Sequence, residues 1–166
     1  MLRFSALALA ALLLSTSAEA AMVGGWDVSD KPDDKNLCSI QRNYEDKDDD
    51  NAKNSVNIVF VKDEKGAPAI VVALGYAKWD LTKGEKSKAD VLFDDKAWQR
   101  GVEWESSSDK VMLTVLEKPE AFIQRFSDGK EMELHFDGKA SDEASFEIPN
   151  AGQAIGAVQS CRSQQK

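Results

Sequence analysis

Apolar and polar residues alternate along much of the chain, with the two-residue period that is typical of half-buried β-strands. The clearest case is 130–136, where Met132, Leu134 and Phe136 fall on one face. Residues 69–74 read AIVVAL and are nearly all apolar, which predicts a central strand covered on both faces. Further strands are predicted over 37–44, 56–61, 76–81, 89–93, 98–104, 111–116 and around Phe146.

Polar segments separate these strands. Residues 62–67 and 83–86 each contain a glycine and predict hairpin turns, the second joining 76–81 to 89–93. Residues 45–54 are rich in charge and predict a solvated loop. The two glycines before Trp26 predict a flexible lead that ends in an anchoring indole.

Two segments have the spacing of short helices. The first runs from Pro119, which suits a first turn, to Gly129, which suits a C-cap, with Phe122, Ile123 and Phe126 as its buried face. The second follows Pro149 and Asn150, and four apolar residues recur there at i, i+3, i+4 and i+7. These are Ala151, Ala154, Ile155 and Val158. The predicted fold is mainly β (α+β), an antiparallel sheet or β-sandwich with two short helices, one of them C-terminal.

Gly152 and Gly156 lie on the opposite side of the second helix from its apolar stripe. Small residues there either let another segment approach closely or simply face solvent. The pattern leaves both possibilities open.

The first twenty residues have the layout of an export signal. Arg3 precedes an apolar run over 4–14, and residues 18–20 (Ala-Glu-Ala) match a small-x-small cleavage site. We expect cleavage after Ala20, which leaves a single β-rich globular domain over 21–166. No other stretch is long and apolar enough for a membrane span. The expected location is periplasmic or secreted.

Cys38 and Cys161 are the two cysteines of the chain. In an oxidising compartment they most simply form one disulfide, which ties the last helix to the first convincing strand. The alternatives are a pair of metal ligands or a redox pair, although no CxxC motif exists. With one histidine and two distant cysteines the chain has no zinc pattern, so we expect no metal and no cofactor.

The formal net charge is −8, and signal removal leaves it unchanged because Arg3 and Glu19 cancel. An acidic surface repels nucleic acid and anionic lipid. The sequence also lacks a basic patch with interleaved aromatic residues, so we expect no nucleic-acid partner.

Catalytic chemistry has little support in the sequence. His135 is the only histidine, lies on the solvated face of its predicted strand, and has no accompanying nucleophile motif such as GxSxG. Two close carboxylate pairs, Asp94 with Asp95 and Glu103 with Glu105, have the residue types of an acid and a base. A chain with 29 acidic residues produces such pairs by chance. We predict no catalytic residues and a protein that is not an enzyme.

A calcium loop is only partly matched. Asp46, Asp48 and Asp50 fit positions 1, 3 and 5, but Asn51 replaces the glycine and Asn57 the bidentate glutamate. A solvated acidic loop is the favoured interpretation.

Four tryptophans are the candidate aromatic contacts. Trp26, Trp79, Trp98 and Trp104 suit the core of a β-rich domain, and they are also the possible ligand-contacting aromatics.

The two ends of the chain resemble a family. Trp26-Asp27-Val28 followed by Cys38, and Phe146-Glu147-Ile148 followed by an alanine-rich helix and Cys161, are similar to the invasion-associated locus B family. The resemblance covers about a quarter of the mature chain, and members of that family carry additional cysteines. It implies a β-rich envelope protein of Gram-negative bacteria that acts by interaction, and it implies no catalytic residues.

The expected function is therefore an exported periplasmic or envelope binding or interaction module without catalytic activity. Its partner would be an unknown protein or envelope component. The alternatives are a carboxylate-based hydrolase, or an inhibitor of an envelope or host enzyme that makes contact through loops such as 45–54 or 82–88.

Overall fold

The structure is a computed structural model that describes residues 20–47, 50–63, 65–136 and 143–165. The expected export signal, apart from Ala20, lies outside the described residues, as does Asp48 of the acidic segment. Neither helix in the described part of the chain has the length and apolarity that a membrane crossing requires.

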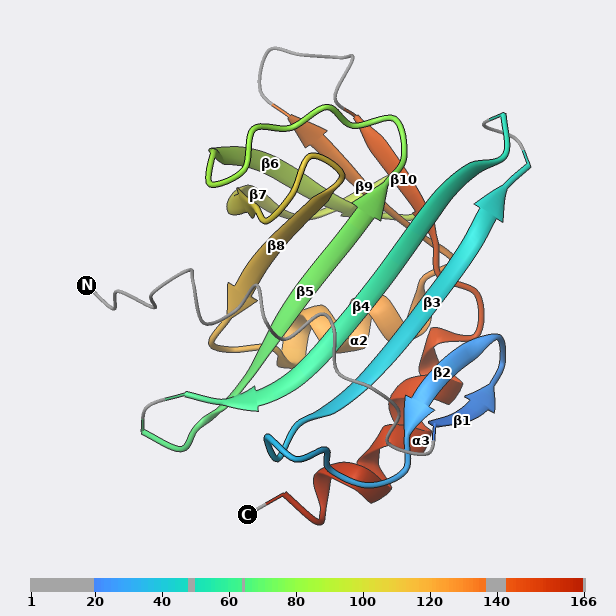
Figure 1. The fold of residues 1–166 in the computed structure, drawn as a ribbon, viewed down its shortest axis with the longest axis vertical. Helices are drawn as coiled ribbons and strands as arrows, with labels where there is room; N and C mark the ends of the chain where they lie inside the picture. The colour runs from blue at the N-terminus through green and yellow to red at the C-terminus, as the bar shows by residue number, and fades with distance from the viewer. Residues whose placement is uncertain (1–19, 48–49, 64, 137–142, 166) are drawn as a thin grey trace.

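Ten strands and two helices make up the described chain (Figure 1). The strands are β1 Ala20–Val23, β2 Trp26–Ser29, β3 Cys38–Asp46, β4 Ala52–Lys62, β5 Pro68–Tyr76, β6 Lys86–Phe93, β7 Lys96–Ser106, β8 Val111–Leu116, β9 Glu131–Phe136 and β10 Ala144–Glu147; the helices are α2 Glu120–Asp128 and α3 Ala151–Arg162. All strands belong to one antiparallel sheet in the order β1-β2-β3-β4-β5-β8-β7-β6-β9-β10. The predicted fold class is confirmed.

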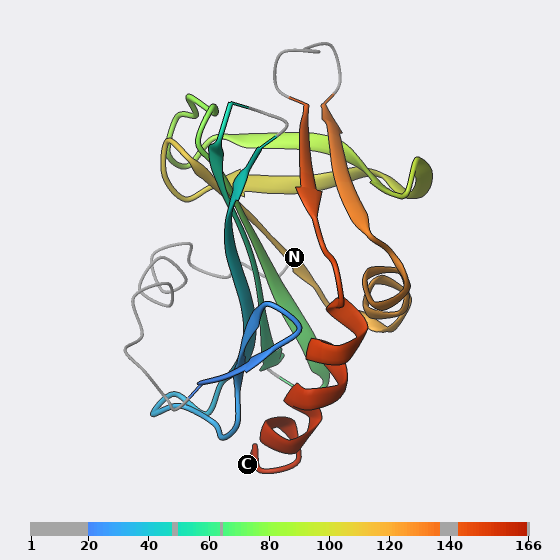
Figure 2. The ribbon, with the colours of Figure 1, turned by 90° about the vertical axis from the view of Figure 1, so that its right-hand side faces the viewer.

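The sheet curves strongly, so that its two ends face each other (Figure 2). Strands β3, β4 and β5 form one wall, while β9, β10 and both helices lie opposite, and β6 and β7 cross between them at one end. The core fills the space inside this curve. As the AIVVAL pattern predicts, β5 is an interior strand between β4 and β8, and residues 69–75 are buried on both faces.

An aromatic cluster seats α2 against the sheet. Phe122 and Phe126 stack with ring centroids 5.7 Å apart, Phe126 meets Trp26 edge-on at 5.6 Å, and Phe122 meets Phe93 at 5.5 Å. Edge-to-face pairs of this kind add to the burial free energy of the rings. The helix therefore joins the first strands to the β6–β7 end of the sheet.

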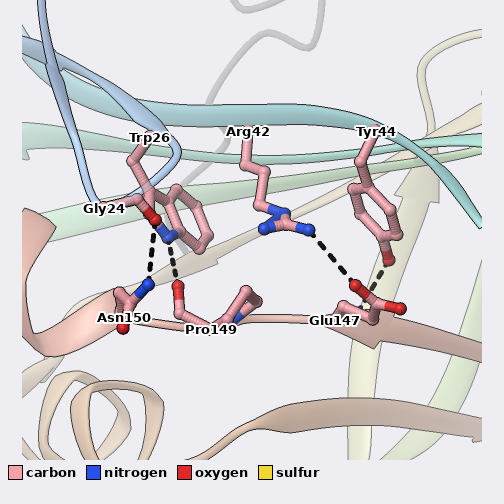
Figure 3. A network of polar contacts seen from close by, with 7 residues as sticks. All are labelled: Gly24, Trp26, Arg42, Tyr44, Glu147, Pro149 and Asn150. Carbon is pink, nitrogen blue, oxygen red and sulfur yellow. Dashed lines mark hydrogen bonds and ion pairs between the residues drawn. The ribbon is translucent and has the colours of Figure 1, made fainter.

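The C-terminal segment is covalently closed onto the start of the sheet. Cys38 at the start of β3 and Cys161 in the last turn of α3 form the predicted disulfide, with Cα atoms 6.0 Å apart and a sequence separation of 123. The indole N–H of Trp26 donates to the carbonyl of Pro149 at 2.7 Å, just before α3 begins (Figure 3). Arg162 lies over the ring of Phe60, 4.6 Å from its centroid.

Several local predictions are wrong. Residues 76–81 do not pair with 89–93: β5 ends at Tyr76, residues 77–85 are turns and coil, and β6 pairs with β7 and β9 instead. The apolar Trp79 that suggested a strand is 3 % exposed because it enters the core from a turn. The charged segment 45–54 is also less of a loop than predicted, since β3 runs to Asp46 and β4 starts at Ala52.

The prediction of a flexible lead before Trp26 is also wrong. Gly24 and Gly25 form the turn of a hairpin between β1 and β2, with φ of 61° and 90°. Residues other than glycine rarely adopt such values.

The two helical glycines have different roles. A Cβ at Gly152 would lie 2.9 Å from the backbone carbonyl oxygen of Ser127, so this glycine lets α3 approach the end of α2. A Cβ at Gly156 would meet nothing within 4 Å. Both possibilities that the sequence left open are therefore realised, one at each position.

We predict that Gly152→Ala and Gly156→Ala change stability in opposite directions. The first forces the two helices apart and should lower the free energy of unfolding by about 1–3 kcal/mol. The second improves helix propensity and should raise it by about 0.5–1 kcal/mol. Urea unfolding of both variants measures the difference, and two changes of the same sign would contradict the assignment.

Candidate functional site

Two hollows lie at the end of the sheet where β3 ends and β4 begins. The larger is a groove of about 830 Å³ and the smaller a pocket of about 290 Å³, and Tyr76 lines both. The groove is lined by Asn43, Tyr44, Glu45, Lys47, Lys53, Asn54, Ser55, Gly75, Tyr76, Ala77, Lys110 and Val111. Its volume falls in the range of small-ligand sites, about 300–1,000 Å³.

Strand register builds the floor of the groove. Asn43 pairs with Ser55, Ser55 with Gly75, and Gly75 with Val111, so these four residues form one row across β3, β4, β5 and β8. They face away from the helices, because the residues that alternate with them, such as Val56 and Leu74, are in the core. A Cβ on Gly75 would collide with the hydroxyl of Ser55, which therefore lies over the glycine. The side chains of the floor therefore rise little above the sheet.

Lysines form much of the rim of the groove. Lys47 and Lys53 are exposed, and Lys110 donates from Nζ to the carbonyl of Trp79. One carboxylate, Glu45, is also present and faces Lys53 directly across the β3–β4 pair. Among the described lining residues, charges of both signs therefore surround the small floor, with cations in excess.

The smaller pocket contains the single histidine. It is lined by Asp46, Tyr76, Glu133, His135, Glu143, Ala144 and Ser145. His135 lies opposite the core face of β9, as its alternation predicts, and its Nε2 is 2.9 Å from a carboxylate oxygen of Glu133. The hydroxyl of Ser145 donates to Glu131. Within the described chain, the polar contact of this histidine is thus with a carboxylate and not with a nucleophile.

A polar seam, formed by Arg42 and Tyr44 of β3 and Glu147 of β10, joins these two strands beside the pocket (Figure 3). The guanidinium of Arg42 lies 3.2 Å from Glu147 and over the ring of Tyr44 at 4.5 Å, while the backbone N–H of Glu147 donates to the Tyr44 hydroxyl at 2.7 Å. Burial raises the pKa of Tyr44, and the hydrogen bond from Glu147 offsets part of that shift. The seam satisfies a backbone donor on the free edge of β10.

Asn54 is a buried polar residue that the sequence analysis missed. It pairs in register with Tyr44 and Tyr76, and it is 2 % exposed. Its amide is close enough to Tyr44 to lower the pKa of that hydroxyl, yet neither of its side-chain polar atoms has a hydrogen-bond partner of normal geometry. Such a group destabilises a fold by about 1–3 kcal/mol. Because the sequence analysis predicted a solvated loop over 45–54, it did not identify Asn54 as a buried strand residue.

The candidate carboxylate pairs have structural contacts. Asp94 accepts the backbone N–H groups of Lys130 and Glu131 at 3.0 and 3.1 Å, and Asp94 and Asp95 have φ of 48° and 62° in the β6–β7 turn. On the β6–β7 pair, Glu103 lies 2.7 Å from Lys86, and this charge-assisted hydrogen bond lowers the pKa of Glu103.

The described residues of the acidic segment do not form a metal site. Asp46 enters the smaller pocket, whereas Asp50 lies 3.7 Å from the ammonium of Lys78. Over the described ranges, no three His, Cys, Asp or Glu side chains are grouped to hold a metal ion.

The four tryptophans contribute to the core, and none of them lines either hollow. Trp26, Trp79 and Trp104 are 0–3 % exposed, and Trp98 is partly buried against Phe93 and Phe122. A ligand contact by these residues remains a prediction, and in this structure Trp98 alone of the four has appreciable exposed surface.

Comparison with known proteins gives a likeness of fold but no match in sequence. No protein-family model matches the sequence, and no curated protein matches it significantly. The crystal structure of invasion associated protein B from Bartonella henselae matches with a TM-score of 0.55, over 88% of this chain and 99% of that chain. The chain shares the fold of that protein. Sequence identity is 13%, so the likeness extends to the fold alone. The resemblance of the two chain ends is thus supported at the level of fold.

We predict that Asp94 is a structural residue. Asp94→Ala loses two hydrogen bonds and places alanine in a left-handed conformation, so it should lower the free energy of unfolding by about 1–3 kcal/mol. Asp94→Asn keeps a side-chain oxygen and tolerates the same φ, so it should cost less than about 1 kcal/mol. Urea unfolding of the two variants provides the comparison. An alanine variant as stable as the natural protein would show that these contacts are unimportant.

Proposed function

We propose that this protein is an exported, non-catalytic binding module of the cell envelope, and that its ligand lies in the groove at the β3–β4 end of the sheet. The observation that carries the proposal is the composition of the groove lining. Its described residues combine lysines, small polar residues and one carboxylate, Glu45, and include neither histidine nor cysteine. Acid–base hydrolysis by carboxylates needs two such groups flanking the reacting bond, so this lining suits binding better than hydrolysis.

Export is supported by two independent features. The N-terminal residues match a cleavable signal, and the described chain contains a disulfide, which persists in oxidising compartments. A periplasmic or envelope location agrees with both. The shared fold with an invasion associated protein supports the same class of role, by interaction with another envelope or host component.

The proposal is tested by filling the groove. Asn43 is exposed at one end of the floor, so Asn43→Trp should block binding without disturbing the core. Lys62→Trp adds the same side chain at the exposed far end of β4 and serves as the control. Cross-linked capture from envelope extract, quantified for each variant, should show a partner that Asn43→Trp loses and Lys62→Trp keeps.

Two results would count against this function. One is a partner captured equally by both tryptophan variants, because the groove would then be irrelevant. The other is turnover of ester, peptide or glycoside substrates by purified protein that disappears when Asp94, Asp95, Glu103 or His135 is replaced, because that would favour a hydrolase.

A further inference from the structure

The described lining of the groove has more lysines than carboxylates, although the protein is acidic. Among the described residues, its lining contains Lys47, Lys53 and Lys110 and one carboxylate, Glu45, whereas the whole chain has a net charge of −8. In an acidic protein, a locally cationic hollow concentrates anionic ligands at that place. The excess of lysines in the groove lining thus favours an anionic partner.

The shape of the groove indicates an extended ligand. The floor row crosses four adjacent strands, from Asn43 on β3 to Val111 on β8. Three strand spacings of about 4.8 Å give a length of about 14 Å, which matches about four residues of an extended peptide. The floor offers the carboxamide of Asn43 and the hydroxyl of Ser55, both of which can pair with peptide N–H and C=O groups.

The two tyrosines that line the groove make contacts on the inner side of the sheet. Tyr44 reaches the backbone of Glu147, and Tyr76 contacts the rings of Trp79 and Phe146 at 5.7 and 6.4 Å, all on the inner side of the sheet. The described ring contacts of these two tyrosines thus lie on the inner side of the sheet, although both residues also line the groove. The polar floor and cationic rim favour a peptide over a glycan.

We propose that the groove binds an acidic, extended segment of a protein partner, with its backbone along the floor row and its carboxylates toward the lysines. This inference rests on the proposed function and specifies the ligand class of the same site.

Substitutions of Lys53 and Glu45 should change the affinity for an acidic peptide in opposite directions. Both side chains are exposed, and they face each other across β3 and β4. With an acidic peptide, Lys53→Gln removes an attraction and Glu45→Gln removes a repulsion. One unit charge at contact distance in water changes affinity by about fivefold. Damage to the sheet, in contrast, would weaken binding in both variants.

The probes are fluorescent hexapeptides from an array with Asp or Glu at two positions, each matched by an Asn or Gln version. Anisotropy at low salt should show binding of acidic peptides that weakens about fivefold in Lys53→Gln and strengthens about fivefold in Glu45→Gln, with both effects reduced at 0.5 M salt. Lys65→Gln, in the distant β4–β5 turn, should bind as the natural protein does.

The inference is overturned if no acidic peptide binds at millimolar concentration, if the matched amide peptides bind equally well, or if the two variants shift affinity in the same direction. Anionic vesicles or sulfated oligosaccharides that bind through Lys53 where acidic peptides do not would also overturn it. Loss of capture in Asn43→Trp would in those cases still support the groove as the binding site, so the two proposals can fail separately.

Discussion

The attachment of the C-terminal segment to the first strands is the constraint on which the rest of the structure depends. The disulfide between Cys38 and Cys161 encloses most of the described chain, and Trp26 holds the carbonyl of Pro149 at the other end of α3. In the chain-entropy model a loop of this size stabilises the folded state by about 4–5 kcal/mol. Because β10 and β3 lie near opposite ends of the sheet order, this attachment keeps the sheet curved around its core.

The inner face of the closed sheet is divided into an apolar end and a polar end. On β3, Cys38 and Ile40 are fully buried, whereas Arg42 and Tyr44 turn to the edge of β10 and bind Glu147. A bare strand edge invites pairing with other chains, and the Arg42 and Tyr44 contacts partly cover this one. Asn54, whose amide has no partner of normal geometry, lies at this polar end and lowers stability, and the floor of the larger groove lies on the outer face at the same end of the sheet. The proposed binding groove therefore lies at the end of the sheet that contains this buried polar group.

The parts of the fold that sequence predicts are those with a strong local period. Residues 130–136, the apolar run 69–74 and α3 repeat their apolar positions clearly, so their type and buried face followed from the sequence. The disulfide followed from the count of two cysteines in a chain that is expected to be exported. The predicted 76–81 hairpin failed because Trp79 is buried by contacts with Phe136 and Phe146, which are distant in sequence. The site was missed for the same reason: its floor is a row of four residues from four strands, visible only once their register is known.

Hydrogen exchange measured by mass spectrometry on the oxidised and reduced protein tests this account most directly. If the attachment holds the curved sheet closed, reduction should speed amide exchange first in β10 and α3, over 144–162, while the centres of β4 and β5 keep their protection. Unchanged exchange in 144–162 after complete reduction would contradict the account. It would show that α3 is held by packing alone and that the disulfide constrains nothing that the fold requires.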